Sequence, residues 1–448
     1  MTKNLTVGNP ALLIVGFTLP LLIGNLFQQF YNMADALIVG RTIGIHALAA
    51  VGSTGSMNFL ILGFMMGFTQ GLSIITSQRF GAGDMAGVRK SFAASIVLGG
   101  IVTVALMVAS VALAMPLLRL LNTPPDIIDA AYSYIIVIYW GFPATLLFNL
   151  LSNMMRAVGD SVTPLIFLVI ASVINILLDF AFILWFHTGV EGAAYATVIA
   201  QALSGLLCIP VMLRKFSMLR VRKTDWKDAG ARMWEHIRVA FPMGFQMSII
   251  AIGAVTVTFA LNNLKSSIAV AAYTASQKID MVATMPLSSF GAAMATYSAQ
   301  NYGARKIDRI KKGVLCCFAI SGTFSVVMGV VCFFAGRYFS SFFLGADQAE
   351  ATALSHIYLK ASGSFYIFLA WLFIARQTLQ GLGNSIVPTL AGIMELLMRV
   401  FAAILLSGFF GFTGLCFANP LAWLGACLPL TIAIVLTIRR LDRRGFPA

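Results

Sequence analysis

The sequence predicts an all-α integral membrane protein with twelve transmembrane helices in two six-helix lobes, related by a parallel internal repeat. Three observations predict this fold: an apolar composition, apolar runs of spanning length, and motifs that recur in the second half. The 448 residues are 59% hydrophobic and only 10% charged, whereas soluble domains carry about 25% charged residues. Together with a mean hydropathy of +0.89, this composition excludes a soluble enzyme.

One span and its loop use roughly 35 to 40 residues, so a chain of this length accommodates about twelve spans. The first apolar run is far longer than a signal-peptide core, so it is predicted to be a span. The expected spans are 11–39, 47–77, 91–118, 127–155, 163–185, 190–213, 236–262, 267–297, 313–336, 350–380, 387–409 and 414–438.

The net charge of +14 indicates topology and not nucleic-acid binding, because the basic residues cluster in alternate loops. Eight lie between Arg214 and Arg238 and five between Arg305 and Lys312. The positive-inside rule places these loops and both termini in the cytoplasm, which requires an even number of spans. We expect a multi-pass protein of the plasma (inner) membrane, with residues 214–235 forming a cytoplasmic linker that meets anionic lipid.

Corresponding motifs occupy both halves of the chain. Gln78–Ala82 reappears as Gln300–Ala304, and Pro20 reappears as Pro242 at the same offset. Gly159–Pro164 reappears as Gly383–Pro388 at nearly that offset. Because these motifs fall in cytoplasmic loops of both halves, the repeat is parallel. Transporters built in this way bind substrate near the midplane between two lobes. The predicted lobes are residues 1–213 and 236–448.

Four acidic residues are predicted at membrane depth: Asp35, Asp179, Asp280 and Glu395. An ionisable group there costs roughly 2.5 to 3.5 kcal/mol and is a candidate functional site. Asp35 ends a polar stripe on one face of the first span, formed by Asn25, Gln28, Asn32 and Asp35. Burial disfavours a bare carboxylate, so Asp35 is expected to be protonated or to hold a cation.

Asp179 shares a helical face with Asn175, four residues earlier, and no Lys or Arg lies on that span. Asn149 and Thr197 offer further oxygens to the same lobe. The alternative is that these groups are structural polar residues that join helices. Glu395 has Arg399 four residues later and is predicted to form a structural ion pair with it. The possible ion-pair partners of Asp280 are Lys278 and Arg376.

Other residue types carry less information. Flexible Met side chains and some neighbouring polar groups suit a promiscuous cavity, although core packing explains any single Met equally well. The six cysteines show no CxxC spacing, the four histidines no metal-ligand spacing, and no catalytic or nucleotide-binding motif is present. We expect no cofactor, and no metal beyond Na⁺. The candidate cavity residues are Gln28, Asn32, Met33, Asn153, Met57, Met65, Met247, Met281, Met285 and Asp280.

The order and spacing of these motifs resemble the multidrug and toxic compound extrusion (MATE) transporters, in their DinF-like branch. The resemblance covers essentially the whole chain: Pro20, the segment Tyr31–Gly40, the paired Gln-x-aromatic-Gly-Ala motifs and the Asn175, Asp179 and Thr197 set. It implies an amino-lobe cation site coupled to drug export. That site comprises Asp35, Asn149, Asn175, Asp179 and Thr197.

The resemblance implies a secondary antiporter, not an enzyme, that exports hydrophobic, often cationic compounds in exchange for H⁺ or Na⁺. Pro20 would permit a bend in the first span. We expect a monomer that meets small-molecule drugs and membrane lipids. Two alternatives remain: a lipid-linked oligosaccharide flippase of the same superfamily, which should need a more basic cavity than Lys278, Arg376 and Arg399 provide, and a membrane enzyme or channel.

Overall fold

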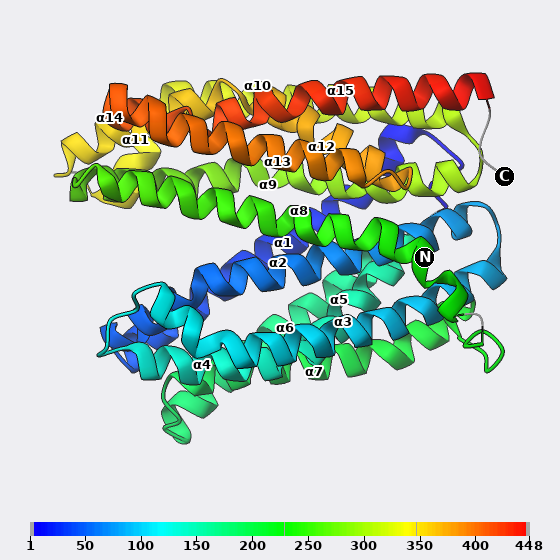
Figure 1. The fold of residues 1–448 in the computed structure, drawn as a ribbon, viewed down its shortest axis with the longest axis horizontal. Coiled ribbons are helices and arrows are strands. Elements are labelled where there is room, and N and C mark those ends of the chain that lie inside the picture. Colours follow the sequence, from blue (N-terminus) through cyan, green and yellow to red (C-terminus); the bar gives the residue numbers. More distant parts are fainter. Residues whose placement is uncertain (1–3, 228, 346, 445–448) are drawn as a thin grey trace. The chain divides into compact units, whose positions relative to one another are not determined.

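The computed structural model describes residues 4–227, 229–345 and 347–444, and all regular structure within them is helical (Figure 1). The first half contains α1 (Pro10–Thr42), α2 (Ile45–Gly81), α3 (Met85–Leu120), α4 (Ile128–Trp140), α5 (Phe142–Ala157), α6 (Val162–Phe180), the π-helix η1 (Ala181–Trp185), α7 (Val190–Lys215) and the short η2 (Ser217–Leu219). The second contains α8 (Ala229–Asn263), α9 (Ser267–Gly303), α10 (Ile307–Leu344), α11 (Ala349–Gly363), α12 (Tyr366–Gly381), α13 (Ile386–Phe401), the π-helix η3 (Ala402–Leu406), α14 (Ser407–Cys416) and α15 (Ala418–Arg444).

The helices of the described residues account for the twelve predicted spans. Nine are long and apolar enough to cross a membrane, and two bent pairs bring this number to eleven. The twelfth is α9, which is 37 residues long but carries Lys278 and Asp280. Its counterpart in the first half is α2, because both bounds of α9 follow those of α2 at the offset that separates Pro20 from Pro242.

Two predicted spans are broken, and the breaks correspond in the repeat. The span expected at 127–155 consists of α4 and α5, bent by 48°, and the span expected at 350–380 consists of α11 and α12, also bent by 48°. Pro143 near the start of α5 explains the first break, because proline cannot continue the hydrogen bonding of the preceding helix. The boundary between the last two spans is marked by Gly411, which has non-helical backbone angles.

The repeated Gly-Asp/Asn-Ser motif separates two helices and starts the second. Gly159 and Gly383 have φ values of +87° and +82°, which favour glycine. Asp160 then accepts hydrogen bonds from the first amides of α6, at 2.9 Å each. Asn384 accepts one from Val387 N of α13 at 3.4 Å. The motif is therefore a helix stop followed by an N-terminal cap.

The repeated Gln-containing motif ends α2 and α9 and binds an incoming chain segment. In the second half, Gln300 Oε1 accepts a hydrogen bond from Leu5 N at 3.0 Å, and Asn301 Nδ2 donates to Leu5 O at 3.2 Å. In the first half, Arg79 Nη2 donates to Glu235 Oε1 at 3.0 Å. The motif at the end of α9 therefore binds the segment just before α1, and the motif at the end of α2 binds the start of α8.

The chain forms two compact units that reflect this exchange. Unit 1 contains Leu19–Gly244, and unit 2 contains Leu5–Thr18 together with the chain from Phe245 onward. Within α1, membership changes directly before Pro20, and within α8 it changes shortly after Pro242. The predicted lobe boundaries at 213 and 236 remain a proposal, because the units assign residues 5–18 and 214–244 differently.

Close packing fixes the first turns of α8 within unit 1. A Cβ atom added to Gly71 of α2 would lie 2.5 Å from the Cα atom of Ala240. The Phe68 and Phe241 rings meet edge to face, with centroids 5.3 Å apart. Glycine at position 71 thus allows the two helix backbones to approach.

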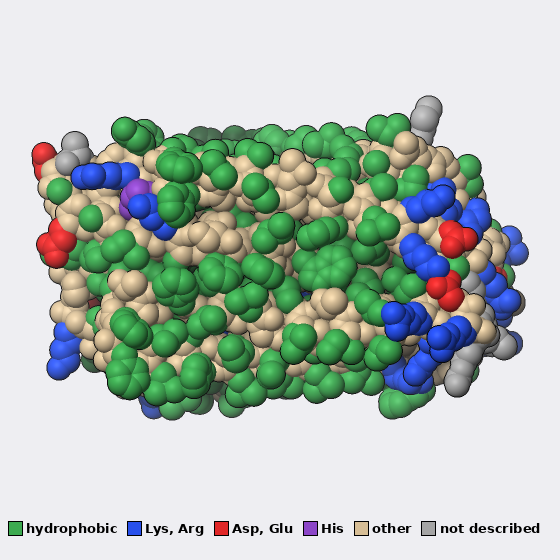
Figure 2. Space-filling model, turned by 90° about the horizontal axis from the view of Figure 1, so that it is seen from above, with side chains coloured by type: hydrophobic (Ala, Val, Ile, Leu, Met, Phe, Trp, Pro, Cys, Tyr) green, Lys and Arg blue, Asp and Glu red, His purple; other side chains and the backbone are tan. Residues whose placement is uncertain are grey.

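The surface chemistry suits a bilayer. Figure 2 shows hydrophobic side chains over most of the viewed face, with Lys and Arg side chains gathered mainly at one end. Large apolar side chains such as Phe334, Phe342 and Phe409 are exposed, which would be costly in water and is expected where lipid is the solvent.

Candidate functional site

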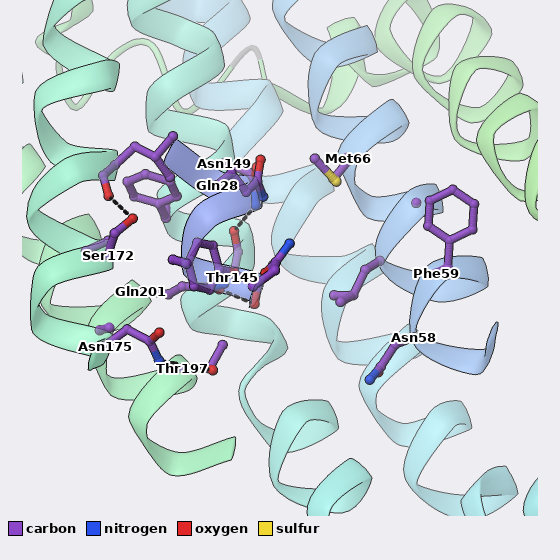
Figure 3. A pocket seen from close by; sticks show the side chains of 18 residues that line it. Gln28, Asn58, Phe59, Met66, Thr145, Asn149, Ser172, Asn175, Thr197 and Gln201 are labelled. Carbon is purple, nitrogen blue, oxygen red and sulfur yellow. Dashed lines mark hydrogen bonds between the residues drawn. The ribbon is translucent and has the colours of Figure 1, made fainter. Parts of the chain in front are cut away.

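Unit 1 contains a pocket of about 370 Å³ whose lining is unusually polar for a membrane interior (Figure 3). Five helices, α1, α2, α5, α6 and α7, contribute to it. The polar lining residues are Gln28, Tyr31, Asn32, Asn58, Thr145, Asn149, Ser172, Asn175, Thr197 and Gln201. The remainder of the lining is apolar, including Phe59, Leu62 and Met66. Such a mixture suits a ligand that is largely hydrophobic but carries a polar or charged group.

The buried face of α6 supplies one wall of this pocket. Ala171, Ser172 and Asn175 line it, and Asp179 lies one turn further along the same buried face. The predicted spacing of Asn175 and Asp179 thus places both side chains inside unit 1. Asn175 Nδ2 donates to Thr197 Oγ1 of α7 at 3.3 Å, while its Oδ1 atom is buried and accepts no hydrogen bond from any described residue.

Asp35 and Asp179, from α1 and α6, lie within hydrogen-bonding reach of each other. Both carboxylate oxygens of Asp179 and Oδ1 of Asp35 are buried and accept no hydrogen bond from the described N–H or O–H donors. No described Lys or Arg pairs with either carboxyl group. Two carboxylates this close repel each other, and they can share a hydrogen bond only if one is protonated. The geometry therefore suits a pair that holds one proton or one cation.

Two tyrosines accompany the carboxyl pair. Tyr31 of α1 and Tyr134 of α4 both interact electrostatically with Asp35 and Asp179. Tyr31 begins the Tyr31–Gly40 segment quoted from the sequence, but neither ring was predicted to belong to the site. For Tyr31, the signal is its position four residues before Asp35. Tyr134 had no such signal, because it lies in a run of apolar residues and comes near the pair only through the packing of α4.

A hydrogen-bond network connects the other polar residues of the pocket. Asn149 Nδ2 donates to Thr145 O at 2.9 Å, and Thr145 Oγ1 donates to Gln201 Oε1 at 2.6 Å (Figure 3). Asn153, which was expected in the cavity, lies one turn beyond Asn149, where its Nδ2 atom donates to Thr69 Oγ1 at 3.1 Å. Of the predicted cation set, Asn149, Asn175 and Thr197 line the pocket, and Asp35 and Asp179 lie beyond it.

The candidate cavity residues of unit 1 are divided between the pocket and other places. Gln28 and Asn32 line the pocket. Met57 and Met65 are buried in a hydrophobic core cluster, whereas Met33 is 54% exposed. The methionine that lines the pocket is Met66. Helical spacing explains this, because adjacent residues such as 65 and 66 point about 100° apart.

The remaining candidates, Met247, Met281, Met285 and Asp280, belong to unit 2. The three methionines are partly buried. Asp280 Oδ1 accepts hydrogen bonds from Ser362 Oγ at 2.6 Å and Tyr366 Oη at 2.7 Å. Neither Lys278 nor Arg376 pairs with it, so both partners considered from the sequence were wrong. The two hydroxyl groups come from α11 and α12. Both helices are far from Asp280 in the sequence, so no local pattern predicted these contacts.

Glu395 accepts hydrogen bonds from two arginines. Arg399 Nη2 lies 2.9 Å from Glu395 Oε1, as the i,i+4 spacing predicts. Arg376 Nη2, from α12, lies 2.5 Å from Glu395 Oε2. All three residues are at least nine-tenths buried. The predicted pair is therefore part of a buried triad with one carboxylate and two guanidinium groups.

Comparison with known proteins identifies the family. The sequence matches the MatE family over residues 20–181 and 242–405. Probable multidrug resistance protein YpnP of Bacillus subtilis is 27% identical over 384 residues, 85% of this chain and 84% of that protein. Multidrug export protein MepA of Staphylococcus haemolyticus is 23% identical over 428 residues, 94% and 92% of the two chains.

Solved structures show the same fold. A crystal structure of MATE in complex with MaL6 has a TM-score of 0.91 at 22% identity, covering 99% of this chain and 100% of that chain. The family match covers most of both halves, with one matched segment in each copy of the internal repeat. The chain belongs to the MATE family, the multidrug and toxic compound extrusion transporters.

Proposed function

We propose that this protein is a multidrug efflux antiporter that exports hydrophobic, often cationic compounds in exchange for H⁺ or Na⁺ by alternating access. The observation that carries the proposal is the pair formed by Asp35 and Asp179, which lies beside the polar pocket of unit 1 and has no basic partner among the described residues.

The pair provides a physical basis for exchange. It cannot hold two uncompensated negative charges in a buried site, so a proton, Na⁺ or a cationic group of the substrate must neutralise it. Occupation by one cation then lowers the affinity for another. By linkage, this coupling is reciprocal: drug binding displaces the ion, and ion binding displaces the drug.

The other residues of the proposed site follow from the lining of the pocket. We propose that Asn149, Asn175 and Thr197 complete the cation site, since the Oδ1 atom of Asn175 is a buried acceptor that no described donor satisfies. Gln28 and Asn32 would contact the substrate. Pro20 would allow α1 to bend as the carboxyl pair changes occupancy, because a proline leaves the carbonyl four residues earlier without its helical donor.

The names of the relatives support drug export, since YpnP and MepA are described as a multidrug resistance and a multidrug export protein. The same names do not favour the oligosaccharide flippase. We further propose that the protein acts as a monomer in the plasma membrane, with both termini cytoplasmic, because the positive-inside rule favours that orientation for the basic loops.

The proposal is tested by efflux of rhodamine B ethyl ester, a fluorescent lipophilic cation, from proteoliposomes. Efflux is driven separately by a pH gradient and by a Na⁺ gradient. We expect one gradient to drive efflux by the wild type. Asp35→Asn and Asp179→Asn should each reduce the initial rate at least about tenfold, since each removes an ion ligand.

Asp126→Asn is the matched control, because it removes a carboxylate whose side chain is 62% exposed. It should leave the rate unchanged. Undiminished gradient-driven efflux by both Asp35→Asn and Asp179→Asn would refute the assignment of the coupling site. Absence of efflux under either gradient would refute antiport of this cation.

A further inference from the structure

The buried triad of unit 2 has an excess of positive charge. Glu395 carries one negative charge and is hydrogen-bonded by both Arg376 and Arg399, which carry two positive charges. Asp280 does not compensate them through an ion pair, because it is held by hydroxyl groups of Ser362 and Tyr366. A buried, incompletely neutralised guanidinium pair is costly unless an anion completes it.

The triad also has unused hydrogen-bond donors. The Nε atoms of Arg376 and Arg399 are buried and have no acceptor in the described part of the chain, and the same holds for the Nε2 atom of Gln246 on α8. As whole residues, Arg376, Arg399 and Gln246 are only 4%, 6% and 3% exposed, respectively. Buried donors are almost always satisfied in native proteins. A ligand with acceptor oxygens would satisfy several of them together.

Three helices converge on these donors. Gln246 of α8 accepts a hydrogen bond from Gln380 Nε2 at 2.6 Å, and Gln380 lies one turn beyond Arg376 on α12. Gln246 also lies against Gly392 of α13, where an added Cβ atom would be 3.3 Å from its Cγ atom. Gly392 lies one turn before Glu395. The unpaired Gln246 amide therefore belongs to the same packed region as the triad.

The internal repeat maps this region onto the pocket of unit 1. At the offset that pairs Gly159 with Gly383, Arg399 corresponds to Asn175 and Glu395 to Ala171, and both of these unit 1 residues line the pocket.

The first helix of each half extends this correspondence. At the offset that pairs Pro20 with Pro242, Gly253 corresponds to Tyr31, another lining residue. Gly253 lies directly against Arg399, since an added Cβ atom would overlap its Nη1 atom. Two members of the triad, Glu395 and Arg399, therefore correspond to lining residues of the polar pocket in unit 1.

We propose that Arg376 and Arg399 form a binding site in unit 2 for the carboxylate group of an amphiphilic substrate, with Glu395 as the residue that positions both guanidinium groups. A planar carboxylate matches the fork of a guanidinium group, and its single charge balances the excess of the triad. The proposal rests on the proposed efflux function, since it assigns residues of unit 2 to one chemical group of the exported compounds.

The test compares two probes that differ only in this group. Rhodamine B has a free carboxylate beside its cationic ring system, whereas its ethyl ester lacks that charge. Binding of each to the purified full-length protein in detergent is measured by fluorescence polarisation, without an ion gradient. Arg399→Gln should weaken binding of rhodamine B at least about tenfold and leave ester binding unchanged. This variant keeps one complete Arg376–Glu395 pair, so folding is expected to persist.

Lys278→Gln is the matched control, because it removes one exposed positive charge of the same unit and should change neither affinity. Arg399→Lys should recover part of the rhodamine B affinity, since it restores the charge without the fork. Equal loss of affinity for both probes in Arg399→Gln would show a purely structural triad and overturn the proposal, as would unchanged binding of rhodamine B. Failure of the antiport proposal would appear separately, as loss of ester efflux with ester binding intact.

Discussion

The two units place opposite charges on corresponding helices. In unit 1, α6 presents Asn175 and Asp179, and Asp179 meets Asp35 without a basic partner among the residues that the structure describes. In unit 2, α13 presents Arg399 at the position of Asn175, and Ala403 follows at that of Asp179. Both helices start from the same motif and continue into a π-helix. Among the described residues, one scaffold thus carries a carboxyl pair without a basic partner in unit 1 and an excess of buried positive charge in unit 2.

The largest effect that this contrast between the units predicts is on the stability of the protein. Glu395→Gln should destabilise the protein by about 3 to 5 kcal/mol, because it leaves two buried arginines without a carboxylate. Asp179→Asn should leave stability unchanged or raise it, since it removes a buried carboxyl group that no described donor satisfies. Thermal unfolding of both variants in detergent measures the difference. Equal destabilisation by the two substitutions would contradict the proposed difference between the two units.

A second prediction concerns the room beside Arg399. Gly253→Ala should destabilise by about 1 to 3 kcal/mol, because the new methyl group would overlap Arg399 Nη1. Gly52→Ala is the control in unit 1, where an added Cβ atom meets nothing within 4 Å. That control should be neutral or slightly stabilising, since alanine favours helix. If Gly253→Ala leaves stability unchanged, the Arg399 side chain does not lie against position 253.

The smallest predicted effect separates the two copies of the capping motif. Burial acts to raise the pKa of Asp160, but hydrogen bonds from Lys215 and Thr163 outweigh it and hold that pKa below its ordinary value. The contribution of Asp160 to the free energy of unfolding is therefore fully present above the unfolded-state pKa of about 3.9. It is lost as the pH falls through the folded-state pKa. Asn384 in unit 2 does not titrate.

Asp160→Asn should consequently cost about 1 kcal/mol at neutral pH, and the cost should vanish in acid. Asn384→Ala should lower stability by a similar amount or less, at every pH. Unfolding temperatures across the acidic range provide the measurement. A pH-independent cost of Asp160→Asn would contradict the ionic part of this cap.

Much of the fold was predictable because apolar runs and repeated motifs are local signals. The twelve spans, their parallel repeat and the stop before Val162 and Ile386 all follow from such patterns. The break between α11 and α12 was not predictable, since no proline marks it. Its counterpart between α4 and α5 has Pro143, which the sequence analysis did not use.

The candidate site shows the same division. Asn175 and Asp179 share a buried face because their spacing is helical, and Glu395 meets Arg399 for the same reason. The contacts of Asp35 with Asp179, of Arg376 with Glu395 and of Ser362 with Asp280 join different helices. Periodicity identifies the inward face of each helix, but it does not say which inward residues meet. The assignment to the DinF-like branch remains a prediction.

The most direct test of the central claim is ion release on drug binding. The purified protein is mixed with rhodamine B ethyl ester in weakly buffered detergent solution, and released H⁺ and Na⁺ are recorded with ion-selective electrodes. We predict that the wild type releases one of these ions as the drug binds and that the double variant Asp35→Asn with Asp179→Asn releases neither. Release of the same amount by the double variant would contradict the assignment of the carboxyl pair as the coupling site.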